Sequence, residues 1–121
     1  MNAPDIIKDP QATPQALHTA GIFVHDDGSR QWVGHMNDNT VRYIAHKLAQ
    51  GAMDKEDEIA RKGYSILGAV NGSVAYDMLE SEIERANDGQ LFRQIVESHP
   101  LWHHLVDEYK RRGLAFPYYR I

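Results

Sequence analysis

The pattern of residues 20–36 constrains the fold of this chain more than any other part of the sequence. Two apolar runs flank Asp27-Gly28, a dipeptide suited to the positive backbone angles of a tight hairpin turn. With these two residues as the turn, Phe23 lies opposite Trp32. An isolated two-stranded ribbon is only marginally stable in water. We therefore expect the hairpin to lie on helices, to join a larger sheet, or to pair with a second copy of the chain.

After the hairpin, the apolar residues change to the spacing of amphipathic helices. Cap residues precede the first of these helices and Gly51 is expected to end it, while acidic residues from Asp54 onward suit the first turn of a second helix. Pro100 suits a first helical turn, and Gly113 suits the cap that ends the last helix. The predicted helices cover residues 39–50, 54–70, 73–87, 90–97 and 99–112.

Residues 65–79, SILGAVNGSVAYDML, fit two structures. Asn71-Gly72 between apolar runs is typical of a hairpin, but the apolar positions on both sides also continue a helical stripe. We favour helices on both sides of Asn71-Gly72 and keep the hairpin as the alternative.

The two ends of the chain differ in character. Residues 1–16 carry three prolines among polar residues, which predicts a flexible arm. The tail over residues 114–121, LAFPYYRI, is apolar and aromatic, so we expect it to lie on the core or to contact a partner. The remainder, residues 17–121, is expected to form one globular domain. We predict an α+β, mainly helical fold with an N-terminal β-hairpin followed by four or five helices.

Composition excludes several classes of function. The 121 residues contain no cysteine, so disulfide scaffolds, thiol nucleophiles and thiolate metal sites are ruled out. No apolar run approaches the roughly 20 residues of a membrane helix, and the N-terminus lacks the pattern of a secretory signal. We expect a cytoplasmic, bacterial-type protein with no membrane partner.

Three polar residues of the last predicted helix, His99, His103 and Asp107, lie at helical spacing. Histidines four residues apart can share a metal, but the stretch lacks the His-Glu-x-x-His pattern that would add a general base. The sequence also shows no phosphate-binding glycine loop, no dinucleotide fingerprint and no nucleophile elbow. We therefore expect no metal, no cofactor and no catalytic residues. A small metal- or histidine-dependent enzyme centred on these three residues is the alternative.

Charge argues against nucleic acid as the partner. The formal net charge is -4, whereas nucleic-acid binding draws most of its affinity from basic residues on phosphates. The C-terminal region nevertheless mixes bases with aromatic residues, a combination that binds single strands. A nucleic-acid-binding regulator is therefore the second alternative, and it would use Lys110, Arg111, Arg112 and Arg120.

The apolar hairpin and the aromatic tail together offer more apolar surface than one small core needs, which favours association with another chain. Our leading hypothesis is a small accessory protein that binds another protein stoichiometrically, for example an antagonist or modulator of a transcription factor, a toxin or a defence complex. We also expect a homodimer. The alternative for each predicted contact residue is a place in the core. The predicted partner-binding residues are Phe23, Trp32, Leu114, Phe116, Tyr118 and Tyr119.

Overall fold

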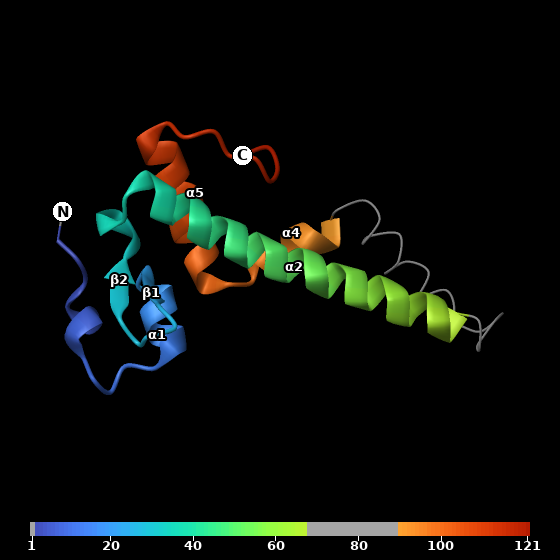
Figure 1. Cartoon of the computed structure of the whole chain (residues 1–121), viewed down its shortest axis with the longest axis horizontal. Coiled ribbons are helices and arrows are strands. Elements are labelled where there is room, and N and C mark those ends of the chain that lie inside the picture. Colours follow the sequence, from blue (N-terminus) through green and yellow to red (C-terminus); the bar gives the residue numbers. More distant parts are fainter. Residues whose placement is uncertain (1, 68–89) are drawn as a thin grey trace. The chain divides into compact units, whose positions relative to one another are not determined.

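The computed structural model describes residues 2–67 and 90–121 (Figure 1). These residues are mainly helical and include one small antiparallel sheet of two strands. The chain divides into two compact units. Unit 1 comprises Met1–Lys47 and His99–Ile121, and unit 2 comprises Leu48–Ser98. The expectation of a single globular domain is therefore not confirmed.

The two strands form the predicted hairpin in unit 1, but with a different register. Strand β1 spans Ile22–Val24 and strand β2 spans Arg30–Trp32. Phe23 lies opposite Gln31, so the predicted pairing of Phe23 with Trp32 is wrong by one residue. Because successive side chains of a strand alternate between faces, Phe23 and Trp32 project from opposite faces of the ribbon.

The register follows from a three-residue turn in place of the expected two-residue turn. The N–H of His25 donates to the carbonyl oxygen of Ser29 at 2.8 Å, and the N–H of Gly28 donates to that of His25 at 2.9 Å. Gly28 has a φ of +86°, a left-handed conformation that commonly closes a three-residue hairpin loop. The Asp27 carboxylate accepts hydrogen bonds from both the N–H and the hydroxyl of Ser29. Asp27-Gly28 thus predicts the position of the turn correctly, but not its length.

The N-terminal segment, predicted to be a flexible arm, contains two short helical elements. The 3-10 helix η1 spans Asp5–Lys8 and helix α1 spans Pro14–Thr19. The Arg30 guanidinium of β2 donates hydrogen bonds to the carbonyl oxygens of Ile7 at 3.1 Å and Asp9 at 2.6 Å. These bonds connect the N-terminal segment to the hairpin. The flexibility of the segment stays a prediction.

The last helix of the chain, α5, spans Pro100–Arg112, within one residue of the predicted bounds. His99 is its N-cap residue, with Nδ1 accepting the N–H of Leu101 at 3.2 Å. Gly113, in the left-handed conformation, ends the helix as predicted, and the N–H of the next residue donates to the carbonyl of Tyr109 at 2.9 Å.

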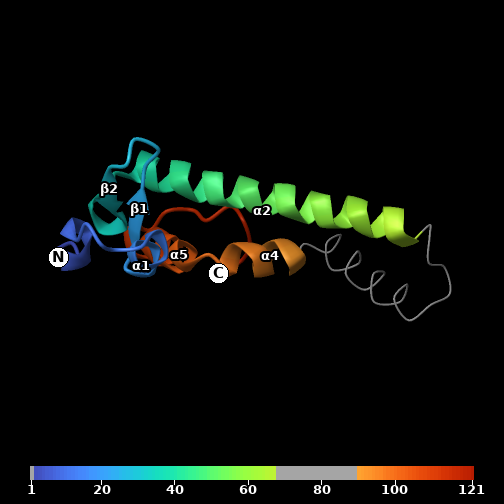
Figure 2. The same ribbon diagram turned by 90° about the horizontal axis from the view of Figure 1, so that it is seen from below.

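Helix α1 packs against both β1 and α5, and it lies beside α5 in Figure 2. The 3-10 helix η2, Val33–His35, follows β2 and also contacts α5. The core of unit 1 lies between these elements and the first turns of the long helix α2. Its most deeply buried side chains are Leu17, Ile22, Val33, Val41, Ile44, Leu101, Trp102, Leu105 and Tyr109.

Helix α2 spans Asp38–Leu67 without interruption. The expected end at Gly51, with separate helices over 39–50 and 54–70, is wrong. A glycine inside a helix costs only about 1 kcal/mol relative to alanine, which the surrounding turns outweigh. The side-chain amide of Gln50 also donates to the Asp54 carboxylate across this turn at 3.0 Å.

Unit 2 contains the continuation of α2 and helix α4, which spans Gln90–Glu97 as predicted. The backbone N–H of Phe92 in α4 donates to the Glu56 carboxylate at 2.8 Å, so an acidic side chain satisfies one open donor of the first turn. The predicted helix over 73–87 and the Asn71-Gly72 alternative lie outside the described residues. Within residues 2–67 and 90–121, no helix combines the length and apolar character needed to cross a membrane.

Candidate functional site

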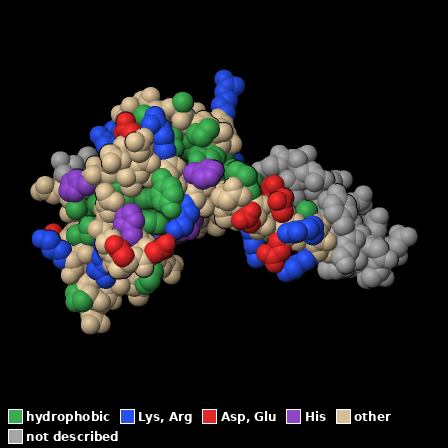
Figure 3. Space-filling view, viewed as in Figure 1, with side chains coloured by type: hydrophobic (Ala, Val, Ile, Leu, Met, Phe, Trp, Pro, Cys, Tyr) green, Lys and Arg blue, Asp and Glu red, His purple; other side chains and the backbone are tan. Residues whose placement is uncertain are grey.

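Apolar side chains reach the surface of unit 1 at several places. In Figure 3 they form a group on the face of this unit that is shown, bordered by histidines. Tyr43 on α2 is 60% exposed, although the sequence analysis did not select it. Phe23, which was selected, is only 9% exposed and belongs to the core. Its ring packs edge-on to His25 and lies 5.9 Å below the Lys47 ammonium.

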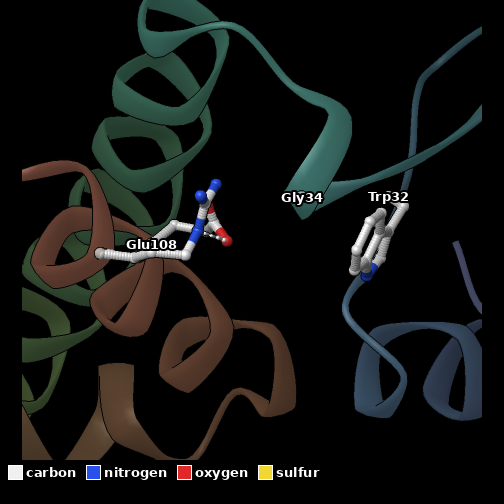
Figure 4. Close-up of a pocket in the computed structure, with 4 residues that line it drawn as sticks. Trp32, Gly34 and Glu108 are labelled. Atoms are coloured by element: carbon white, nitrogen blue, oxygen red, sulfur yellow. Dashed lines mark hydrogen bonds and ion pairs between the residues drawn. The ribbon is translucent and has the colours of Figure 1, made fainter. Parts of the chain in front are cut away.

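A surface hollow of about 150 Å³ in unit 1 contains a second selected residue, Trp32 (Figure 4). Trp32 is the last residue of β2, and Gly34 lies in η2 just after it. Glu108 and Arg111 come from the last turns of α5. The hollow therefore lies between an aromatic ring and an ion pair from distant parts of the sequence.

The Trp32 indole is held in place by its neighbours. A Cβ atom added at Gly34 would lie 2.5 Å from the indole ring, so the ring rests directly on the backbone of that residue. The His35 ring packs edge-on to the indole, with ring centroids 4.8 Å apart. Trp32 is half-buried, so part of this fixed ring remains accessible.

The charged side of the hollow is a carboxylate that binds two guanidinium groups. Glu108 accepts two hydrogen bonds from Arg111, at 3.0 and 2.7 Å, and one from Arg112 at 2.7 Å. These hydrogen bonds, with that from Arg111 the strongest influence, lower the pKa of Glu108 against the opposing effect of burial. Arg112, whose side chain is 12% exposed, also donates to Asp38 at 3.0 Å and to the carbonyl oxygen of Val33 at 3.3 Å.

The predicted contact residues of the tail pack on α5 of their own chain. Trp102 is fully buried, and its indole N–H donates to the Tyr119 hydroxyl at 2.8 Å. Its ring also packs against Phe116 and Tyr118, with centroids 5.7 and 5.4 Å away. Burial raises the pKa of the Tyr118 hydroxyl. These three tail residues and Leu114 are half-buried, so each combines a place in the fold with some accessible surface.

Two histidines, the N-cap residue His99 and His104 within α5, contact helix α1. His99 lies against His18 of α1, with ring centroids 4.9 Å apart, and His104 Nε2 lies 2.8 Å from the carbonyl oxygen of Thr19. Burial lowers the pKa of both His18 and His99, and His18 lowers that of His99 further.

The two remaining candidate ligands, His103 and Asp107, are exposed. In the described ranges, no three side chains of the metal-binding types lie close enough together to hold an ion. Among the described residues, His99, His103 and Asp107 therefore do not converge with one another on a metal site.

The four basic residues considered for nucleic acid have different surroundings. Arg112 is largely buried in its ion pairs, and Arg111 is paired with Glu108. Lys110 and Arg120 are exposed. The cluster therefore presents fewer free charges than the sequence alone suggests.

Trp32 was predicted from the sequence, whereas its neighbours Gly34 and Glu108 were missed. The spacing of Glu108 from Arg111 and Arg112 is that of ion pairs on one helix face, a signal that was available. Comparison of the chain with protein-family models, with curated proteins and with solved structures finds no match.

Proposed function

We propose that this chain is a small accessory protein that binds another protein stoichiometrically, as an antagonist or modulator of a transcription factor, a toxin or a defence complex. The observation that carries the proposal is the accessible Trp32 ring, held against Gly34 beside Arg111. Tryptophan and arginine are among the side chains that most often dominate the binding energy of protein interfaces.

The contrast between the two tryptophans supports this function. Trp102 is fully buried, and its indole N–H is bonded within the fold. Trp32 remains half-buried although its ring is fixed by Gly34 and His35. A ring that is already ordered loses little conformational entropy on binding, so more of its burial is available as affinity.

We further propose a cytoplasmic location, which a chain without cysteine suits, and a bacterial-type protein. Self-association into a homodimer belongs to the same proposal, because a second copy is itself a protein partner. The half-exposed rings of the tail, Phe116, Tyr118 and Tyr119, are the next candidates for contact after Trp32.

The test is affinity purification from the source organism with quantitative mass spectrometry and sedimentation of the purified chain. We expect one protein, or a second copy, in stoichiometric amount with the natural chain and with the control Tyr43→Ala. The Trp32→Ala variant should lose this bound partner while keeping the circular dichroism of the folded chain. A strictly monomeric chain without a stoichiometric partner would overturn the proposal, and undiminished capture by Trp32→Ala would remove Trp32 as its anchor.

A further inference from the structure

The Arg111 side chain keeps hydrogen-bond donors available in the Trp32 hollow. A guanidinium has five N–H groups, and Arg111 uses one on Nε and one on Nη2 for Glu108. The remaining three N–H groups, including the two on Nη1, make no hydrogen bond to other described residues. The Arg111 side chain is 54% exposed, so these groups are accessible.

The side-chain acceptor of the hollow, the Glu108 carboxylate, is already bonded to both arginines. Both oxygens of Glu108 accept from Arg111, and Oε2 also accepts from Arg112. The Glu108 side chain is 14% exposed, so it offers little of its charge to a ligand. A cation entering here would meet the Arg111 guanidinium before an available carboxylate, which is unfavourable.

The size of the hollow limits the ligand to about one side chain. Its volume of about 150 Å³ equals roughly five water molecules at about 30 Å³ each. The wall opposite the ion pair is the flat apolar ring of Trp32 (Figure 4). The occupant must therefore have an acceptor at its tip and a short apolar stem.

We propose that the hollow receives an acidic side chain, glutamate or aspartate, from the protein partner; this inference rests on the proposed function. The carboxylate accepts the free N–H groups of Arg111, while its methylene groups lie against the Trp32 indole. Hydrogen bonds between a guanidinium and a carboxylate are among the strongest available to a protein surface. Trp32 thus supplies apolar contact and Arg111 supplies selectivity for an acidic residue.

The test is an NMR titration of the full chain with N-acetyl-glutamate N-methylamide. The neutral isostere N-acetyl-glutamine N-methylamide and the cation N-acetyl-lysine N-methylamide are compared with it. We expect the glutamate probe to shift the indole N–H signal of Trp32 and the Nε–H signal of Arg111. The indole signal of Trp102, which is buried and bonded to Tyr119, serves as the internal reference.

Two variants separate a specific site from general charge. Arg111→Gln and Lys110→Gln each remove one positive charge from the same turn of α5, but only the first changes the hollow. We expect Arg111→Gln to weaken glutamate binding about tenfold and Lys110→Gln to leave it nearly unchanged. Gly34→Ala should also weaken it, because its Cβ displaces the Trp32 ring.

Each contrary result overturns the inference. The inference is wrong if the glutamate and glutamine probes give equal shifts, or if the lysine probe gives a larger shift. It is also wrong if Arg111→Gln and Lys110→Gln lose equal affinity for the glutamate probe. A Trp32 signal that moves with protein concentration alone, but not with the glutamate probe, would assign the hollow to a second copy instead. A partner captured equally well by Arg111→Gln would leave the proposed function standing while the acidic side chain is rejected.

Discussion

The indole N–H of Trp102 in α5 donates a 2.8 Å hydrogen bond to the hydroxyl oxygen of Tyr119 in the C-terminal tail. Trp102 is fully buried, so its one polar atom needs an acceptor inside the protein. The tail supplies that acceptor and surrounds the indole with aromatic rings. The tail is therefore packed on the core of unit 1 through this hydrogen bond and these ring contacts.

Replacing Tyr119→Phe removes this acceptor while the ring is kept. We expect a loss of about 1–2 kcal/mol in the free energy of unfolding, because a buried donor is left without its partner. Tyr118→Phe is the matched control, since no hydrogen bond links its hydroxyl to other described residues. Urea denaturation measures both variants. Equal stability of the two would show that water replaces the Tyr119 hydroxyl without loss.

The glycine inside α2 predicts a stabilising substitution. A Cβ at Gly51 would have no heavy atom within 4 Å beyond its own helix turn. Gly51→Ala should therefore raise the free energy of unfolding by about 0.5–1 kcal/mol through helix propensity. Thermal unfolding followed by circular dichroism measures this change. A destabilised Gly51→Ala variant would contradict the continuous, open helix at this position.

The two neighbouring arginines of α5 should differ in their contribution to stability. Arg112→Gln removes a largely buried guanidinium that bonds Glu108, Asp38 and the Val33 carbonyl. We expect it to cost about 1.5–3 kcal/mol of unfolding free energy. Arg111→Gln should cost less, because the Arg111 side chain is 54% exposed and Glu108 keeps its hydrogen bond from Arg112. Chemical denaturation of both variants is the measurement, and equal losses would contradict the network described here.

The histidine pair predicts that stability falls in mildly acidic solution. Burial holds the pKa values of His18 and His99 below the unfolded value of 6.5. The unfolded chain therefore binds more protons below pH 6.5, and the free energy of unfolding decreases as pH falls from 6.5 through the lowered folded pKa values. Protonation of His99 at Nδ1 also removes the acceptor for the Leu101 N–H at the positive end of α5.

The test of this pH dependence is the free energy of unfolding above and below pH 6.5. His99→Asn keeps a side chain that caps helices but does not titrate, so it should reduce the loss on acidification. His46→Asn, on the exposed surface of α2, is the control and should leave the loss unchanged. An identical decrease in the natural chain and in His99→Asn would exclude the pair as the cause.

Local patterns predicted much of the fold. The apolar period and caps located α4 and α5, and Asp27-Gly28 located the hairpin. The strand register was missed, because a turn of two residues and a turn of three residues both accept this dipeptide. The continuity of α2 was missed because a single glycine costs too little to end a helix that its flanking turns support.

The candidate site was predictable only in part. Trp32 was selected from its residue type, but its neighbours across the hollow lie on the last helix, far away in sequence. Only the packing of η2 against α5 brings these residues together. The tail rings were predicted as partner contacts, which stays a prediction. The hydrogen bond from Trp102 to Tyr119 depends on tertiary structure.

Unit 1 is built from two separate stretches of chain, with all of unit 2 between them. During synthesis on the ribosome, the hairpin and α1 emerge first and must wait for α5 before they can complete their core. Unit 2 is the continuous stretch of chain between them, so it is synthesised before α5. The nascent hairpin therefore exposes apolar side chains for most of that time, which makes this interval the one in which chaperones would engage the growing polypeptide.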